Sequence, residues 1–398
     1  MELHRPYPLP DNLLDLVEAE APRFSPEEIT RRHNAIRELM SKNDINYLLV
    51  YGSFWNGPGI HWLTHWPASA EAALVVTPGD INKLFVQFYN HVPQAAECAT
   101  DCEVKWGGED TIAEVIKEFR ERGSNGNDKV GVIGPLGMAG ASRLREVFSG
   151  IIDLNRDFVG IRLVKSPEEI DWMKIGAWYS DRAMQAVTEI LVPGITERQL
   201  GDVCQRSWVP LGGDTVIHFF GSTSMDNPNC YVPRQLPSVR PIQKGDAVFC
   251  EISGAFWGYS GQVLRTFTIE SEATSLFRDL HDTAEAAYSA IYNVLKDGVT
   301  AQEIVEASSV IEKSGFTTCD DLVHGYGGGY FPPIVGSASR PAGLIPDFTL
   351  RAGMLVVIQP NIIAKNEKAG VQTGECVLIT KEGCDTIHNF KSGLQRLG

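Results

Sequence analysis

Residues 245–267 read GDAVFCEISGAFWGYSGQVLRTF and hold one β-type run and most of a second. The runs DAVFCEIS and QVLRTFTI are dominated by β-branched, aromatic and other apolar residues, and the glycines between them suit a turn. Two more β-type runs, MLVVIQPN and ECVLIT, follow near the C-terminus, and helical stretches such as SLFRDLHDTAEAAYSAIYNVLKDG lie between. Strands and helices in this order predict an α+β domain.

A new domain is predicted to begin at Ser166. This serine can cap a helix, Pro167 suits the first helical position, and Glu169 can return a hydrogen bond to the cap. Upstream, apolar runs such as INYLLVYG and AALVVT alternate with helical stretches such as TIAEVIKEFRERG. The alternation predicts an α/β domain over residues 1–164, followed by the α+β domain over residues 165–398.

The composition is that of an acidic globular protein. The formal net charge is -15, and 43% of the residues are hydrophobic, which is enough for large cores. A negative surface argues against nucleic acid and anionic membranes as partners. No apolar run approaches the roughly 20 residues that span a bilayer, and the N-terminal stretch lacks the pattern of a signal peptide, so we expect a cytoplasmic protein. Its eight cysteines show no paired CxxC spacing and are expected to be mostly reduced.

Four motifs carry a resemblance to a known family. After residues 245–267 come LVHGYGGGYFPP around His324, RAGMLVVIQPNI around Gln359 and GVQTGECVLIT around Glu375. In this order the motifs resemble the creatinase, prolidase and methionine aminopeptidase family. The resemblance implies a pita-bread C-terminal domain, which is a curved antiparallel sheet backed by helices with pseudo-twofold symmetry, and an α/β creatinase-like N-terminal domain. It also implies a homodimer.

The family usually holds two metal ions on five side chains, and this chain departs from that pattern. The resemblance places Glu251, Gln262, His324, Gln359 and Gly374 at the five positions. Hard divalent cations need anionic oxygen ligands, and a glutamine carbonyl supplies only a dipole. We therefore expect that the metal site is lost and that the protein uses no metal or other cofactor.

Glu251 and His324 are the predicted catalytic pair. Glu251 stands in an apolar strand, where a carboxylate is either paired with an arginine such as Arg265, raised in pKa, or functional. The functional interpretation is favoured because the segment resembles that of ectoine hydrolase, a metal-independent relative whose glutamate in a similar setting is implicated in a covalent intermediate. The glycines around His324 allow a substrate to approach its imidazole.

Gln262, Gln359 and Glu375 are predicted to bind the substrate. The two glutamines donate and accept hydrogen bonds without carrying charge, which suits an amide or ureido carbonyl, although both could instead be satisfied core amides. Glu375 takes the last carboxylate position of the family only if one residue is deleted. Without that deletion it points to the opposite face of its strand.

Cys230 and several aromatic residues are further candidates. With Tyr231, Cys230 occupies the place where prolidases and creatinase carry a catalytic histidine. A nearby cation could lower the pKa of the thiol and make it a nucleophile, and the alternative is a loop cysteine without activity. Aromatic residues usually form core, but apolar walls with a few polar groups also describe a small-molecule site. The predicted walls are Tyr259, Tyr330 and Phe331, with Trp55 reaching a partner's pocket as the resemblance implies.

The sequence favours a metal-independent hydrolase of a C–N bond in a small non-peptide metabolite, which would be an amide, a lactam or a ureido compound. Glu251 would attack the carbonyl carbon or activate water, and His324 would pass the proton to the leaving nitrogen. Two alternatives stay open. One is a metal-dependent Xaa-Pro peptidase or a lyase with Glu251, His324 and Glu375 as ligands, and the other is a non-catalytic binding protein.

Overall fold

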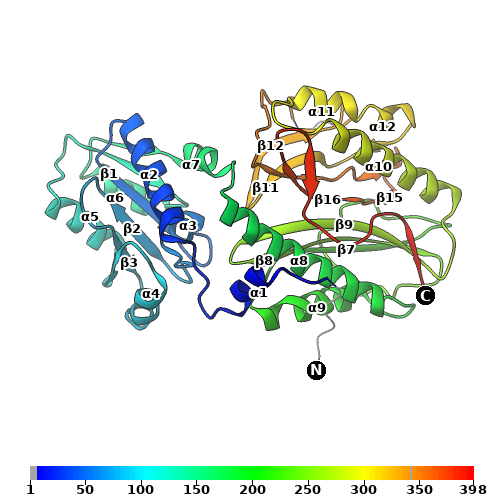
Figure 1. The fold of residues 1–398 in the computed structure, drawn as a ribbon, viewed down its shortest axis with the longest axis horizontal. Helices are drawn as coiled ribbons and strands as arrows, with labels where there is room; N and C mark the ends of the chain where they lie inside the picture. Colours follow the sequence, from blue (N-terminus) through cyan, green and yellow to red (C-terminus); the bar gives the residue numbers. More distant parts are fainter. Residues whose placement is uncertain (1–6, 341–342) are drawn as a thin grey trace. The chain divides into compact units, whose positions relative to one another are not determined.

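The computed structural model describes residues 7–340 and 343–398, which form two compact units. One unit is Glu20–Arg162, and the other combines the described part of Met1–Ala19 with Leu163–Gly398. Figure 1 shows the helices and strands of both. Within the described ranges, no helix is both long enough and apolar enough to cross a bilayer.

The division into units differs from the predicted domains at the N-terminus. The predicted boundary near residue 164 lies close to the division in the structure, but the described residues 7–19 belong to the C-terminal unit. Its helix α1 (Asp11–Glu18) lies against α8 (Pro167–Ile190). The indole Nε1 of Trp178 donates to the backbone carbonyl of Tyr7 at 2.6 Å, which ties this segment to α8.

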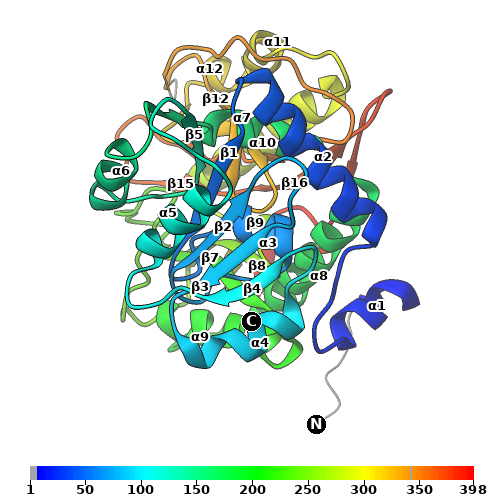
Figure 2. The ribbon, with the colours of Figure 1, turned by 90° about the vertical axis from the view of Figure 1, so that its left-hand side faces the viewer.

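The unit Glu20–Arg162 is built on a six-stranded mixed sheet with helices on both faces (Figure 2). The strand order is β4-β3-β2-β1-β5-β6, with β1 antiparallel to β2 and parallel to β5. Apolar side chains of α2, α3 and α7 pack on one face, and those of α5 and α6 pack on the other. This arrangement confirms the predicted α/β architecture. The strands are β1 (Tyr47–Gly52), β2 (Ala72–Val76), β3 (Lys83–Val86), β4 (Glu103–Trp106), β5 (Lys129–Ile133) and β6 (Gly150–Asp153). The helices are α2 (Pro26–Lys42), α3 (Pro58–Thr64), α4 (Val92–Cys98), α5 (Thr111–Glu121), α6 (Met138–Arg145) and α7 (Asn155–Arg162), with a 3-10 turn at Tyr89–His91.

The C-terminal unit contains a curled nine-stranded sheet whose main path is β12-β11-β13-β16-β9-β8-β7. Neighbours on this path are antiparallel, and the sheet with its helices confirms the predicted α+β fold. The strands of the path are β7 (Asp214–Ser224), β8 (Asp246–Phe256), β9 (Tyr259–Ile269), β11 (Asp321–Tyr326), β12 (Tyr330–Gly336), β13 (Leu355–Ile358) and β16 (Gly374–Ile379). Two edge strands, β17 (Cys384–Thr386) and β18 (Gln395–Leu397), pair with β16 and β9, and a small separate sheet contains β10 (Thr317–Thr318), β14 (Ile362–Ile363) and β15 (Gly370–Val371).

Helix α8 begins at the predicted cap and covers one face of this sheet. Ser166 Oγ accepts from the backbone N–H of Glu169 at 3.2 Å, and Glu169 Oε2 accepts from the backbone N–H of Ser166 at 3.0 Å. The helix lies close to β9 because Gly261 leaves room for it, since a Cβ atom there would stand 2.5 Å from Ala177. The other helices of the unit are α9 (Glu197–Trp208), α10 (Ser275–Val294), α11 (Ala301–Ala307) and α12 (Val310–Lys313), with a 3-10 turn at Val209–Leu211.

Candidate active site

The register of β8 and β9 decides which of the predicted residues can meet. Glu251 stands opposite Leu264, and Ser253 stands opposite Gln262, so Glu251 and Gln262 project from the same face of the sheet. Gly261, one residue before Gln262, faces the opposite way, toward α8. The candidate site therefore lies on the face of the sheet that α8 does not cover.

Glu251 is the centre of the site. It is 5% exposed, and both of its carboxylate oxygens accept from amide nitrogens: Oε1 from Gln262 Nε2 at 2.9 Å, and Oε2 from Gln372 Nε2 at 2.8 Å. Burial raises the pKa of Glu251 to about 8, the charges of Asp320 and Asp321 add to the rise, and the bond from Gln372 opposes it. A carboxyl with this pKa can both take and give a proton near neutral pH.

Gln359 links Glu251 to the rest of the site. Its Oε1 accepts from Gln262 Nε2 at 2.9 Å and lies 3.3 Å from His324 Nε2, and its Nε2 donates to Asp320 Oδ2 at 3.3 Å. The structure thus brings together Glu251, Gln262, Gln359 and His324, which the sequence analysis took from three separate motifs.

His324 is fully buried, and burial lowers the pKa of its imidazole to about 4. Its Nδ1 lies 3.1 Å from the carbonyl oxygen of Gly325, and its ring stacks on Tyr330 with 4.0 Å between the ring centroids. A neutral imidazole carries a single N–H, so only one of its two nitrogens donates. A pKa this low makes the neutral ring a weak base, and the role of proton shuttle predicted for His324 stays a prediction.

Asp320, Asp321, Asn361 and Gln372 belong to the site and were missed by the sequence analysis. Asp320 Oδ2 accepts from Asn361 Nδ2 at 3.0 Å, and Asp321 Oδ2 accepts from Tyr330 Oη at 2.7 Å. Burial and a hydrogen bond with the Asp321 carboxyl raise the pKa of Asp320 to about 7. Two consecutive aspartates directly before the apolar run LVHG were the available signal. We call the connected set the Glu251 network: Glu251, Gln262, Asp320, Asp321, His324, Tyr330, Gln359, Asn361 and Gln372.

The atoms that this network leaves without a protein partner are acceptors. Among the described residues, Gln262 Oε1, Gln372 Oε1 and Asn361 Oδ1 are buried and have no hydrogen-bond partner, and the three residues are at most 1% exposed. The sequence analysis expected Gln262 to hold a carbonyl group, which requires a donor. Its amide nitrogen is instead committed to Glu251 and Gln359, so what Gln262 offers a ligand is a carbonyl oxygen.

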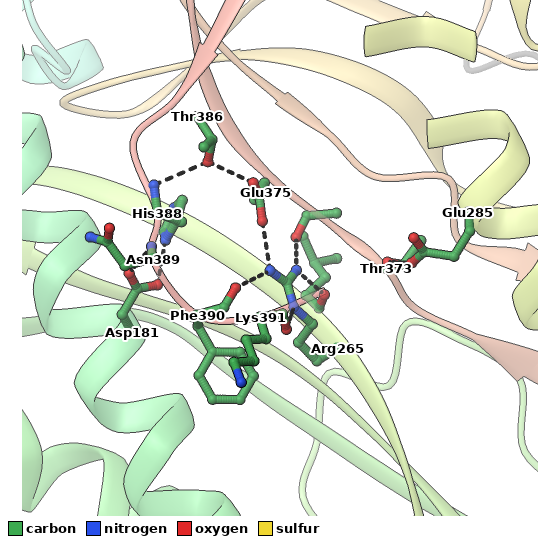
Figure 3. A network of polar contacts seen from close by, with 12 residues as sticks. Asp181, Arg265, Glu285, Thr373, Glu375, Thr386, His388, Asn389, Phe390 and Lys391 are labelled. Atoms are coloured by element: carbon green, nitrogen blue, oxygen red, sulfur yellow. Dashed lines mark hydrogen bonds and ion pairs between the residues drawn. The ribbon is translucent and has the colours of Figure 1, made fainter. Parts of the chain in front are cut away.

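Glu375 lies on the other face of the sheet, which corrects the substrate-binding role predicted for it. It stands opposite Val263, one residue away from the position of Gln262, and its Oε2 accepts from Arg265 Nη2 at 2.6 Å. Its Oε1 accepts from Thr386 Oγ1 at 2.6 Å. Figure 3 shows this separate network, in which Arg265 holds Glu375 and two backbone carbonyls near the C-terminus. Arg265 therefore partners Glu375 and not Glu251.

Tyr259 and Phe331 also lie away from the Glu251 network. Tyr259 Oη donates to Glu169 Oε1 on α8 at 2.8 Å, on the covered face of the sheet. Phe331 stands opposite Gly325, the strand neighbour of His324, and its ring lies 4.8 Å from Lys165 Nζ. These two aromatic side chains serve packing against α8 and the segment before it, which corrects their predicted place in the substrate wall.

Cys230 lacks the lowered pKa that a nucleophilic thiol needs. It is 5% exposed and packs with Val232, Phe249 and Ile363. Arg234 Nη1 lies 3.5 Å from its Sγ, yet burial outweighs the cation and raises the pKa of the thiol. The sequence alternative of a cysteine without activity is the better description.

The substrate-binding roles of Tyr231 and Trp55 stay predictions. Tyr231 is 51% exposed beside Cys230, and Trp55 is 69% exposed in the unit Glu20–Arg162.

The Glu251 network does not fit the paired metal centre of the related family. At the five positions, Gln262, Gln359 and Gly374 offer no anionic oxygen, and both oxygens of Glu251 already face amide N–H groups. Over the part of the chain that the structure describes, no three or more His, Cys, Asp or Glu side chains are grouped so that they could hold a metal ion.

Comparison with curated proteins shows relatives along most of the chain. A protein of Sinorhizobium fredii named "Uncharacterized hydrolase/peptidase y4tL" is 25% identical over 392 residues, which cover 92% of this chain and 95% of that protein. The Xaa-Pro dipeptidase of Pyrococcus furiosus is 24% identical over 317 residues, which cover 79% of this chain and 86% of the dipeptidase.

Solved structures share the fold. An Xaa-Pro dipeptidase from Bacillus anthracis matches with a TM-score of 0.79 and 20% identity over 93% of this chain and 100% of that one. The prolidase from Pyrococcus furiosus matches with a TM-score of 0.75 and 19% identity over 89% and 99% of the two chains. The family model of metallopeptidase family M24 matches residues 171–381, which is more than half of the chain and includes the whole Glu251 network. The chain therefore belongs to metallopeptidase family M24, a family of hydrolases.

Proposed function

We propose that this protein hydrolyses an amide C–N bond of a small molecule, with Glu251 as the residue that exchanges protons. The observation that supports the proposal most is the environment of Glu251: a buried carboxyl, hydrogen-bonded by two amides, with its pKa raised to about 8. A general base is most effective when its pKa lies near the working pH, because it is then both available and strong enough to take a proton.

Two routes use this carboxyl. In the first, Glu251 takes a proton from water while the water oxygen bonds to the carbonyl carbon, and then gives that proton to the leaving nitrogen as the C–N bond breaks. In the second, a Glu251 oxygen bonds to the carbonyl carbon, the leaving nitrogen takes a proton from water as the C–N bond breaks, and the hydroxide that remains cleaves the resulting anhydride and restores the Glu251 carboxylate. A pKa of about 4 makes His324 a weak base, which favours the route in which Glu251 itself returns the proton.

The sequence prediction and the names of the relatives both bear on the class of substrate. The sequence analysis predicted a non-peptide metabolite, whereas relatives from several organisms carry the name Xaa-Pro dipeptidase, which favours a dipeptide. Both are small amides, and the chemistry at Glu251 is the same for either. The proposal is therefore that the amide C–N bond is cleaved without a metal ion, and dipeptides are the first substrate class to test.

A metal-dependent peptidase is the second candidate. The family name and the named relatives favour it. The ligand set that the sequence analysis allowed for it, Glu251, His324 and Glu375, is not available, since Glu375 projects from the opposite face of the sheet and binds Arg265. Activity that appears only with an added divalent cation would support this candidate.

Turnover of an amide panel tests the proposal. The panel contains Xaa-Pro dipeptides, lactams, ureido compounds and simple amides, and the release of amine is measured with chelator present. We expect at least one substrate to be cleaved, with a loss of about a hundredfold or more in Glu251→Gln, which keeps the shape of the side chain but cannot take a proton. A matched control is Glu367→Gln, the same change in an exposed ion pair with Arg340. Equal rates for Glu251→Gln and wild type would sink the proposal, and binding without turnover of any compound would support the non-catalytic alternative.

A further inference from the structure

We propose that the edge strand β4 docks a second copy of this chain, with the two β4 strands antiparallel and a twofold axis at Val104. Strand β4 lies at one end of the six-stranded sheet and, within the described residues, pairs as a strand only with β3 (Figure 2). An unpaired edge presents open backbone N–H and C=O groups, to which another strand can add. This surface lies outside the Glu251 network, so the proposal does not depend on the proposed function.

The backbone of β4 decides which residues can bond to a partner strand. The N–H groups of Glu103 and Gly107 donate to carbonyl oxygens in and beside β3, at 2.8 and 2.7 Å, so both residues turn their backbone toward β3. Successive residues of a strand bond to opposite sides. The N–H and C=O groups of Val104 and Trp106 therefore point outward, where a partner strand can reach them.

The charges on β4 favour one register of the pair. With the axis at Val104, Glu103 lies directly opposite the partner's Lys105, in the closer, non-hydrogen-bonded kind of pair, and the same contact repeats across the axis. An axis at residue 103 would oppose two glutamates, and an axis at residue 105 would oppose two lysines. Glu103 and Lys105 also contact each other within one chain. The paired edge therefore holds four charges of alternating sign.

Glu103 and Lys105 are accessible to a partner. Their side chains are 48% and 44% exposed, and they project from one face of the sheet, whereas Val104 packs against the core on the other face. Unlike charges placed directly opposite stabilise a strand pair, and like charges weaken it. Because a twofold axis brings each residue opposite the other, the edge is complementary to itself. This self-complementarity favours a second copy of the chain over a different protein.

Exposed aromatic side chains extend this surface beyond the strand. Trp106, at the end of β4, is 46% exposed, and Tyr89, in the turn after β3, is 71% exposed, with 5.7 Å between their ring centroids. The indole Nε1 of Trp106 donates to the carbonyl oxygen of Gln87 at 3.1 Å, which holds the ring in place. Aromatic residues are enriched in protein interfaces. With the axis at Val104, Trp106 lies opposite the partner's Cys102.

Charge reversal at the two positions tests the proposal. The mass of the full-length protein in solution is measured by sedimentation velocity as a function of its concentration. We expect wild type to associate, and Lys105→Glu and Glu103→Lys each to raise the dissociation constant at least about tenfold, because each turns two attractive contacts into two repulsive ones. The double variant Glu103→Lys/Lys105→Glu exchanges the charges and should associate like wild type. The control Lys117→Glu, the same change at an exposed residue of α5, should leave association unchanged.

A mixture of the two single variants tests the register itself. Equal amounts of Lys105→Glu and Glu103→Lys place a glutamate opposite a lysine at both contacts, so the mixture should associate more tightly than either variant alone. If copies also meet through another surface, the single reversals should halve the mass and the mixture should restore it. A wild type that stays a single chain at every concentration would overturn the proposal. Single reversals that leave the mass unchanged, or a mixture that does not associate, would overturn it as well.

Discussion

Glu251 accepts two amide hydrogen bonds, which normally favour the charged form of a carboxyl, and its pKa nevertheless lies near 8. Burial is the largest cause, and the charges of Asp320 and Asp321 add to it. The balance means that at pH 7 the protonated form is the more populated one. Catalysis by the ionised form is therefore expected to depend on pH in the neutral range.

The dependence of kcat/KM on pH follows from this balance. The ionised fraction of Glu251 rises with pH, so we predict that kcat/KM increases about tenfold per pH unit below pH 8 and levels off above it. Asp320→Asn removes a negative charge near Glu251, which lowers the pKa of Glu251 and moves the midpoint of the profile to lower pH. A midpoint unchanged by Asp320→Asn would show that the two residues are not coupled.

The raised pKa of Glu251 also predicts a pH-dependent stability difference for Glu251→Gln. Because the folded-state pKa is raised, the stabilising contribution of Glu251 is fully present below pH 4.5 and is lost as the pH rises toward 8. Glutamine has no such loss. Between pH 5 and pH 8.5, the unfolding free energy of the variant should therefore improve relative to wild type by a few kcal/mol, because a tenfold difference in proton affinity between the folded and unfolded states is worth about 1.4 kcal/mol. Urea unfolding of both proteins at pH 5 and pH 8.5 measures this difference in unfolding free energy. The same difference between variant and wild type at both pH values would refute the prediction.

Among the individual residues of the site, those that stand in recognisable motifs could be predicted from the sequence. Glu251 and His324 could be found because each stands within a short motif, Glu251 in an apolar strand and His324 next to a run of glycines. Asp320 and Gln372 could not be placed, because their approach to Glu251 depends on how β11 and β16 pair with distant strands. The direction in which Gln262 turns its amide was also beyond the sequence, since it is fixed by the carboxylate that it meets.

Among the strands, a shift of one residue along β16 moves a side chain from the face of the Glu251 network to the face that α8 covers. Gly374 stands opposite Leu264 on the face of the Glu251 network, and Glu375 stands opposite Val263 on the face of α8. The sequence analysis left both positions open for Glu375, because the motif alone does not show which residue of β16 pairs with which residue of β9. Helix starts were easier to predict, as the cap at Ser166 shows, because the signal lies within four consecutive residues.

Glu375→Gln tests the division of the sheet into two faces. The substitution removes one charge of the buried pair with Arg265, whose side chain is 1% exposed, and should lower the free energy of unfolding by roughly 1–3 kcal/mol. Because Glu375 faces away from Glu251, kcat/KM should stay within about threefold of wild type. Glu367→Gln provides the exposed comparison, for which about 1 kcal/mol or less is expected. A tenfold loss of kcat/KM with unchanged stability would return Glu375 to the active site.

Across the whole molecule, stability should depend on acid through buried histidines, and one of them lies in the unit Glu20–Arg162. In the unit Glu20–Arg162, His65 Nε2 accepts from the backbone N–H of Phe24 at 2.9 Å, and its Nδ1 lies 2.9 Å from Thr100 Oγ1. The Phe24 bond requires Nε2 without a hydrogen, so protonation breaks it. Burial accordingly lowers the pKa of His65 to about 4. This unit carries an acid-sensitive contact that no motif in the sequence reveals.

Acid unfolding of this unit provides the corresponding measurement. The folded-state pKa of His65 is depressed, so its contribution to stability is present above pH 6.5 and is lost as the pH falls toward 4, by up to roughly 3 kcal/mol. We predict that His65→Asn, which suits the left-handed backbone at this position, loses less stability between pH 7 and pH 4.5 than wild type does. His91→Asn serves as the control. Identical losses in all three proteins would mean that His65 does not control acid sensitivity.

The central claim, amide hydrolysis by Glu251 without a metal ion, is tested most directly by measuring turnover and metal content in the same sample. After dialysis against chelator and then buffer, the metal content is determined by plasma mass spectrometry and amine release is measured at once. We predict that turnover persists with less than about a tenth of an equivalent of any divalent metal, because the Glu251 network offers too few anionic oxygens to hold one. Turnover that falls with the metal content and returns when manganese, cobalt or zinc is added would contradict the claim.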